Sequence, residues 1–282
     1  MKKVLFNLFG DKYTSVAKSY REKQTLFYSY LHPYNFTLSR YHGTFLENHP
    51  SEGYSNTIKA SVNRIIYVFW TGDNEITPNR LAAIKSMEDK CGVEIKLITT
   101  HNLIDYIKNE DPLPEAYYYL SLNHRSDYLR AYFMYHYGGG YADIKRHSHS
   151  WVNAFNALDN SDNFGIGYPE VSCWGAAQSA ITQPNLKHDV FVYWRYLIGN
   201  CAYIFRPHTI FTAEWYSEAK KRLVENLELL KKHPAKDVFG TNADYPLPWL
   251  AMHGSIFHPL CLKYNSGLLK DKSLTPSFKD YR

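Results

Sequence analysis

The apolar positions of the chain are most regular between residues 64 and 98. Residues 64–72 form a nearly continuous apolar run, which is typical of a parallel strand buried on both faces. Residues 78–90 follow with apolar side chains at helical spacing, and residues 93–98 alternate as a second strand. A strand, a helix and a strand in this order predict a right-handed, nucleotide-binding α/β unit.

A second regular stretch contains a helix, a glycine turn and a strand. From Tyr128 onward, apolar residues recur at i, i+4, i+5 and i+8 over about three helical turns, with Ser126 and Asp127 as N-cap-type residues ahead of them. Residues 138–140 are all glycine, which ends a helix without steric strain, and residues 141–144 restart as a short extended run. The acid Asp143 is therefore predicted at the end of a strand.

Charged residues in this stretch indicate a binding site. Asp127 and Arg130 are three residues apart, so they share one helical face near the predicted helix N-terminus. Ligands of open α/β sheets collect beyond the carboxyl ends of the strands, where Asp143 is expected. The helix face and the strand end together predict one polar site.

The ordered set Ser126-Asp127-x-x-Arg130 and Tyr135-x-Tyr137-Gly138-Gly139-Gly140-Tyr141-x-Asp143 carries a family resemblance. It resembles the signature of glycosyltransferase family 32 and of capsular-polysaccharide-synthesis transferases, which are distantly similar to the catalytic domains of clostridial glucosylating toxins. The resemblance implies a GT-A-type α/β fold, with a mixed, mostly parallel sheet flanked by helices. It also implies retaining transfer of a hexose from a UDP- or GDP-sugar to a surface polysaccharide or a lipid-linked glycan.

The resemblance also assigns roles to residues. Trp70 and Gly72 match the family's first strand, I-x-x-x-W-x-G, whose tryptophan stacks on the base; a tryptophan that only packs in the core is the alternative. Gln178 falls near the family's polar amide beside the donor sugar, or is a plain edge-strand glutamine. A late His253 or Trp249 is expected to close over the diphosphate. The expected substrate-binding residues are Trp70, Thr71, Gly72, Thr99, Asp127, Arg130, Gly139, Gly140, Tyr141 and His253, and the expected catalytic residues are Asp143, Lys145 and Gln178.

Lys145 departs from the family pattern, because it stands where the family has the second aspartate of D-x-D. That aspartate holds Mn²⁺ or Mg²⁺, and a lysine ammonium cannot be a ligand of such an ion. Asp143 would be the remaining metal ligand if a metal is used. The alternatives are a metal-independent transferase, in which Lys145 contacts the diphosphate, and a non-catalytic nucleotide- or glycan-binding relative in a polysaccharide biosynthesis complex.

Composition and charge narrow the class of protein further. The 282 residues are 45% hydrophobic with a net charge of +5, and this positive charge suits anionic partners such as nucleotide diphosphates. The sequence contains no recognisable nucleic-acid-binding motif. The four cysteines are scattered, as in a reduced protein. The N-terminus does not complete a signal peptide, and no stretch approaches a membrane span. We expect a cytoplasmic protein, compatible with peripheral attachment to the inner membrane face.

The rest of the chain gives a coarser prediction. Residues 1–60 are expected to form an extension, with a strand at 4–9 and a helix to Leu31, packed on a main transferase domain of residues 61–282. The later elements predicted from the sequence are helices at 152–158, 189–199 and 213–233, a strand at 163–168, a loop facing the site at 206–212 and a second loop at 246–258.

Overall fold

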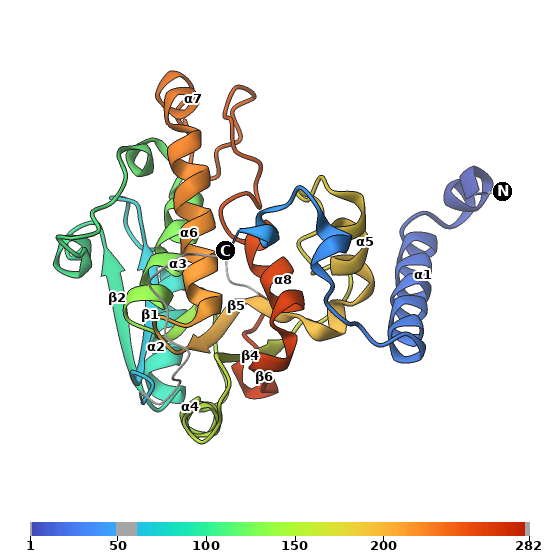
Figure 1. The fold of residues 1–282 in the computed structure, drawn as a ribbon, viewed down its shortest axis with the longest axis horizontal. Coiled ribbons are helices and arrows are strands. Elements are labelled where there is room, and N and C mark those ends of the chain that lie inside the picture. Colours follow the sequence, from blue (N-terminus) through green and yellow to red (C-terminus); the bar gives the residue numbers. More distant parts are fainter. Residues whose placement is uncertain (1, 49–60, 280–282) are drawn as a thin grey trace.

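The computed structural model describes residues 2–48 and 61–279. Its centre is a six-stranded sheet in the order β2-β1-β3-β5-β4-β6, flanked by helices on both faces (Figure 1). The strands are β1 (Ile65–Trp70), β2 (Glu94–Thr99), β3 (Gly139–Ala142), β4 (Gly165–Pro169), β5 (Ile198–Phe205) and β6 (Leu268–Lys270). This mixed, mostly parallel α/β architecture is consistent with the predicted GT-A-type fold class.

The direction of the strands defines one functional edge of the sheet. β1 pairs in parallel with β2 and with β3, and β4 pairs in parallel with β6. β5 lies between β3 and β4 and is antiparallel to both. Consequently five strands end at the same edge, and β5 contributes its first residues to that edge.

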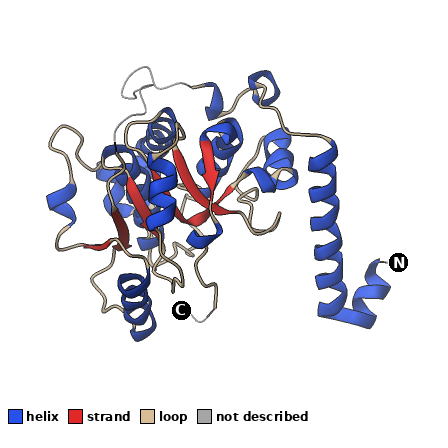
Figure 2. Ribbon diagram, turned by 90° about the horizontal axis from the view of Figure 1, so that it is seen from below, coloured by secondary structure: helices blue, strands red, loops and turns tan. Residues whose placement is uncertain are grey.

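Helices cover the two faces of the sheet unequally (Figure 2). Two α-helices, α2 and α4, pack on one face, while α3, α6 and α8 cover the other face with a larger aromatic core. The α-helices are α1 (Lys2–Leu31), α2 (Pro78–Lys90), α3 (Leu122–His136), α4 (Val152–Asp159), α5 (Pro184–Val192), α6 (Ile210–Glu225), α7 (Leu227–Lys232) and α8 (Gly254–Lys263). None of the helices within residues 2–48 and 61–279 combines the length and apolar character that crossing a bilayer requires.

Short 3-10 helices complete the chain and mostly lie in the connections. They are η1 (Leu38–Tyr41), η2 (Phe45–Glu47), η3 (Leu103–Tyr106), η4 (Glu115–Tyr119), η5 (Trp194–Tyr196), η6 (Asn265–Gly267) and η7 (Lys272–Leu274). η3 and η4 lie in the connection between β2 and α3.

The N-terminal prediction is partly wrong. Residues 4–9 are helical rather than a strand, because α1 runs from Lys2 to Leu31. The helix lies at the periphery of the molecule beside α5, and residues 49–60 of the predicted extension lie outside the described residues (Figure 1). The division into an extension and a main domain therefore stays a prediction.

Three predictions in the second half of the chain are also wrong. The predicted helix at 189–199 is the end of α5, then η5 and the start of β5. The loop expected to face the site lies instead at the amino end of β3, since Arg206 donates to the backbone oxygens of Leu158 and Ser161. The predicted loop at 246–258 ends in α8, which begins at Gly254.

Candidate active site

Two glycines set the geometry of the turn that leads to the site. After α3 ends, Gly138 and Gly139 adopt φ values of 60° and 82°, a left-handed conformation that favours glycine. A Cβ atom on Gly138 would also lie only 2.7 Å from the backbone nitrogen of Pro207. The chain can therefore reverse tightly and run back along α3, so that Asp143 emerges beside that helix at the carboxyl end of β3.

The helix itself begins earlier than the sequence indicated. Ser121 is the N-cap, and its side chain accepts a hydrogen bond from the backbone N–H of His124. Asp127 and Arg130 therefore lie inside α3 rather than at its N-terminus. Their charges are stabilised by side-chain pairing and not by the helix end.

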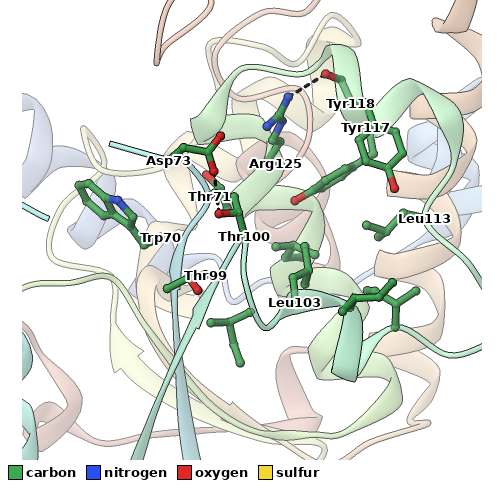
Figure 3. Close-up of a pocket in the computed structure, with 14 residues that line it drawn as sticks. Trp70, Thr71, Asp73, Thr99, Thr100, Leu103, Leu113, Tyr117, Tyr118 and Arg125 are labelled. Atoms are coloured by element: carbon green, nitrogen blue, oxygen red, sulfur yellow. Dashed lines mark hydrogen bonds between the residues drawn. The ribbon is translucent and has the colours of Figure 1, made fainter. Parts of the chain in front are cut away.

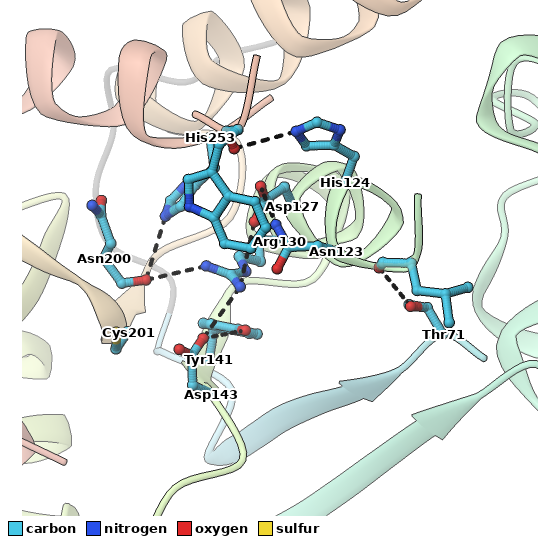
Figure 4. A network of polar contacts seen from close by, with 12 residues as sticks. Thr71, Asn123, His124, Asp127, Arg130, Tyr141, Asp143, Asn200, Cys201 and His253 are labelled. Atoms are coloured by element: carbon cyan, nitrogen blue, oxygen red, sulfur yellow. Dashed lines mark hydrogen bonds and ion pairs between the residues drawn. The ribbon is translucent and has the colours of Figure 1, made fainter. Parts of the chain in front are cut away.

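Four charged side chains form one largely buried network at this edge, and Figure 4 shows three of them, Asp127, Arg130 and Asp143. Arg130 Nη2 lies 3.3 Å from Asp127 Oδ1 and 3.2 Å from Asp143 Oδ1, so one guanidinium joins the two acids. Lys145 Nζ donates to Asp143 Oδ2 at 2.7 Å, and the hydroxyl of Tyr141 donates to Asp143 Oδ1 at 2.7 Å. The predicted residues Asp127, Arg130, Tyr141, Asp143 and Lys145 are thus brought together.

The pKa values follow from burial and from these contacts. Burial alone would raise the pKa of Asp143, but the charges of Lys145 and Arg130 and the Tyr141 hydroxyl bring it well below its usual range. Burial raises the pKa of Asp127, and the neighbouring Arg130 only partly offsets this. Burial lowers the pKa of Lys145, but Asp143 more than reverses that shift and raises it. Asp143 and Lys145 are therefore both charged at neutral pH.

The first residues of β5 complete the network, although no sequence motif pointed to them. The backbone oxygen of Asn200 accepts from Arg130 Nη1 and from His253 Nε2, each at 3.3 Å (Figure 4). The thiol sulfur of Cys201 accepts from Lys145 Nζ at 3.0 Å, and burial raises the pKa of that thiol to about 11. Contacts through a backbone carbonyl or a single neutral thiol do not require a recognisable sequence motif. For this reason neither Asn200 nor Cys201 was predicted.

His253 lies in the network but has no proton to offer a diphosphate. Because the carbonyl of Asn200 can only accept, Nε2 carries the ring proton. Burial and then the charge of Arg130 lower the pKa of His253 well below its ordinary value, so the ring is neutral. In this geometry His253 holds Arg130 and β5 in place rather than donating to a ligand.

Several buried polar atoms of the site have no partner among residues 2–48 and 61–279. They are Arg130 Nε, Asn200 Oδ1 and His253 Nδ1. Buried polar atoms are almost always hydrogen-bonded, so unpaired atoms gathered at one place are a mark of a binding site. The charges of the network therefore balance one another, while three of its buried polar atoms remain able to hydrogen-bond to a ligand.

The residues present do not fit a divalent metal ion. Both oxygens of Asp143 already bind protein cations and a hydroxyl, and Asp127 Oδ1 faces Arg130. In the described part of the chain no three His, Cys, Asp or Glu side chains gather as a metal-binding group. Mn²⁺ and Mg²⁺ prefer several oxygen ligands, and the ammonium of Lys145 occupies the place where such an ion would meet Asp143.

A pocket of about 280 Å³ lies at the carboxyl ends of β1 and β2 (Figure 3). Trp70, Thr71 and Thr99 line it together with Arg125 and Leu129 of α3. Thr71 donates its hydroxyl proton to the backbone oxygen of Leu122 at 2.6 Å, which fastens β1 to the start of α3. The pocket is mostly apolar, as expected for a flat ring, and it includes three of the predicted substrate-binding residues.

The pocket and the charge network flank α3. Arg125 and Leu129 lie on one side of the helix, whereas Asp127 and Arg130 lie on the other. The indole of Trp70 is half-buried against the core on the α2 face and donates to the backbone oxygen of Asn74 at 2.8 Å. The structure therefore places Trp70 on the strand next to β3 without bringing it into contact with Asp143.

Four other predicted residues lie outside the network. Gly72 packs against Leu122 in the turn after β1. Gly139 and Gly140 lie deep in the sheet against Ile65 and Trp151, so the structure explains them by packing and does not bring them to the ligand edge. Gln178 is half-buried in the loop after β4, next to Ala177, which packs near Gly254 and Asn200.

The comparison with protein families agrees with this geometry. A family model described as "Glycosyltransferase sugar-binding region containing DXD motif" matches residues 48–160. The matched segment contains β1, β2, α3, β3 and the four charged residues of the network. This supports sugar binding of the glycosyltransferase type and suggests a transferase. Comparisons with curated proteins and with solved structures found no match.

Proposed function

We propose that the protein transfers a hexose from a UDP- or GDP-sugar to a glycan or lipid-linked acceptor without a divalent metal. The observation that carries this proposal is the contact of Lys145 Nζ with Asp143 Oδ2 at the edge of a sheet matched by a sugar-binding family model. Families of this kind act on nucleotide sugars and often use a metal. In this chain a fixed ammonium takes the place of the ion.

The charges support this substitution. Two aspartates with a divalent cation have no net charge, and one aspartate with one lysine has none either. Replacing the second aspartate of D-x-D by Lys145 therefore changes the formal charge by as much as the ion would. Asp127 and Arg130 form a second balanced pair beside it. A diphosphate approaching this edge would then meet no uncompensated negative charge.

In the proposed reaction the protein acts mainly through placed charge. Trp70, Thr71 and Thr99 would hold the base and ribose, while Asp127 and the unpaired Nε of Arg130 would bind sugar hydroxyls. Lys145 and Arg130 would stabilise the negative charge that grows on the departing diphosphate. Gln178 would face the donor sugar from the loop after β4. We propose retention of the anomeric configuration and assign no nucleophile.

One observation favours a second candidate, a non-catalytic nucleotide- or glycan-binding relative. Lys145 is buried, and its ammonium already binds Asp143 and Cys201, so a phosphate can contact it directly only by entering the charge network. A site whose charges are all paired can bind a sugar through the unpaired atoms of Arg130 and Asn200 without promoting bond breakage.

Donor hydrolysis measured with and without EDTA separates the two candidates. Thermal-shift screening of UDP- and GDP-sugars would first identify the donor that binds. A metal-independent transferase releases the nucleotide diphosphate at the same rate in the presence of the chelator. Binding without release of nucleotide, with or without an offered acceptor, would identify the binding relative instead.

The variant Lys145→Asp tests the residue that carries the proposal. Because it restores D-x-D, we expect turnover to fall by about tenfold or more without metal and to recover in part with added Mn²⁺. Lys96→Asp is the control, because Lys96 is half-exposed and its ammonium pairs with Glu94, outside the charge network. Unchanged, EDTA-insensitive turnover of Lys145→Asp would reject the assignment.

A further inference from the structure

The helix α1 has its polar and apolar sides reversed relative to an ordinary surface helix. Among residues 15–31, whose side chains the structure describes, the buried residues are Thr25 and Ser29, which are 4% and 0% exposed. Leu26 is partly buried against the core, but four large apolar residues face outward: Val16 is 68% exposed, Tyr20 64%, Phe27 66% and Leu31 60%. A helix on a protein surface normally buries its apolar face, so this outer face lacks the partner that its residues suit.

The exposed residues form one stripe. Val16, Tyr20, Phe27 and Leu31 are spaced i, i+4, i+11 and i+15, which places them on one side of a helix. We call these four residues the outer stripe. Lys23 lies within it and is exposed as well. Aromatic, aliphatic and lysine side chains on one helix face are the composition of helices that lie in a bilayer interface.

Polar contacts hold α1 to the body through the opposite face, so the outer stripe stays outside. The indole of Trp194 donates to the Thr25 hydroxyl at 3.1 Å, and Arg195 donates to the backbone oxygen of Ser29 at 3.0 Å. The indole of Trp174 donates to the backbone oxygen of Lys18 at 3.3 Å. Figures 1 and 2 show α1 at the edge of the molecule, extending away from the sheet.

Charge distinguishes between the surfaces that the stripe could meet. The sequence from Lys2 to Leu31 contains six lysine and arginine residues and two acidic residues, a net charge of +4, while the whole chain carries +5. Two such helices from two copies would repel each other. An anionic surface would be attracted, at about 1 kcal/mol per lysine or arginine near the lipid headgroups.

We propose that α1 docks the protein on an anionic phospholipid surface, with the outer stripe inserted among the lipid headgroups. The basic residues of the helix would provide attraction to the headgroups, and the stripe would provide the apolar burial. The contacts through Trp174, Trp194 and Arg195 then fix the body relative to the membrane plane. The proposal does not depend on the transferase assignment, because it concerns a different face and needs no sugar.

Co-sedimentation of the full-length protein with vesicles tests the proposal. One set of vesicles is phosphatidylcholine alone and the other is phosphatidylcholine and phosphatidylglycerol in equal parts. We expect binding to the second set to be at least about tenfold stronger and to weaken with added salt. Equal binding to both sets, or no binding to either, would overturn the proposal.

Variants assign the binding to the outer stripe. Phe27→Ser and Tyr20→Ser should each weaken vesicle binding by about tenfold, since an exposed aromatic ring loses its apolar burial. Lys23→Glu should weaken binding only to the anionic vesicles. Val224→Ser is the matched control, because Val224 is an exposed apolar residue on α6. A stable dimer that Phe27→Ser dissociates would show instead that a second copy covers the stripe.

Discussion

Two partly buried aspartates with nearly the same partners lie beside α3, Asp143 next to its first half and Asp111 next to its last turn. Asp143 binds Lys145, Arg130 and the Tyr141 hydroxyl. Asp111 binds Lys220, His136 at 2.9 Å and the Tyr216 hydroxyl at 2.8 Å. Burial alone would raise the pKa of each carboxyl, and in each case the partners lower it below the ordinary value. A chemical description of either cluster alone would not separate them.

Their surroundings separate them. Asp143 follows β3 at the edge where five strands end, and the unpaired atoms of Arg130, Asn200 and His253 lie beside it. Asp111 lies near the last turn of α3 and ties α6 to that end of the helix. A paired acid is therefore evidence of a site only when its position and leftover hydrogen-bonding capacity also point to a ligand.

The largest expected difference comes from removing the cation of each cluster. Arg130→Met leaves Asp127 and Asp143 without their shared partner, so we expect a loss of about 3–5 kcal/mol in the free energy of unfolding. We also expect donor turnover to fall by about 10²-fold or more. Lys220→Met, the counterpart at Asp111, should change stability by about 1 kcal/mol or less, because Lys220 is 41% exposed.

Chemical denaturation and donor hydrolysis of both variants check this prediction. Arg130→Lys keeps one positive charge but joins only one carboxylate, and it should fold while losing most of the turnover. Equal loss of turnover in the Lys220 and Arg130 variants would remove the distinction between the two clusters.

Acidification should also affect the stability of the two aspartate clusters differently. His147 lies close to Asp143, and burial lowers its pKa from 6.5 to about 4. A folded pKa below the unfolded value means that the unfolded chain binds the proton first, so stability falls as pH falls from about 6.5 to about 4. At pH 5 the loss from this residue is about 2 kcal/mol.

His147→Leu should therefore flatten the loss of stability between pH 7 and pH 5, measured by urea unfolding at each pH. His136, in the Asp111 cluster, should contribute less. Burial lowers its pKa too, but its hydrogen bond to Asp111 shifts the pKa back upward. A His136→Gln variant that flattens the profile as much as His147→Leu would contradict this ranking.

The smallest effect is expected for a matched pair of hydroxyl deletions. Tyr141→Phe and Tyr216→Phe each remove one hydrogen bond to a partly buried carboxylate, so each should lower the free energy of unfolding by about 1–2 kcal/mol. Only Tyr141→Phe should also lower the turnover number for donor hydrolysis. An equal drop in turnover for both variants would mean that stability alone explains the loss.

The first half of the fold could be predicted because its sequence patterns are local. The apolar run of β1 and the helical spacing of α2 are explained by burial within each element, and the predicted bounds of α2, residues 78–90, agree with the observed Pro78–Lys90. β5 could not be predicted, because Gly199, Asn200 and Cys201 interrupt its apolar run and its pairing partners are distant in sequence. Strand 4–9 failed because residues 2–31 form one continuous helix.

The candidate site was predictable only in part, for a similar reason. Asp127, Arg130 and Asp143 are brought together by one helix, one turn and one strand, so their spacing reveals the arrangement. Asn200 of β5 and His253, the N-cap residue of α8, join the site differently: the backbone oxygen of Asn200 accepts hydrogen bonds from Arg130 and from His253. Contacts through a main-chain atom depend on tertiary packing and leave no trace in residue identity.

The short strand β3 makes the site sensitive to chain length. Tyr141 and Asp143 point to the same side because they are two residues apart, which lets the phenol reach the carboxylate. Deleting Ala142 would turn the acid toward α2 and α4, even though every side chain of the network would still be present. Among homologous chains, an insertion or deletion between the glycine turn and this acid should therefore change the activity more than substitutions at the same positions.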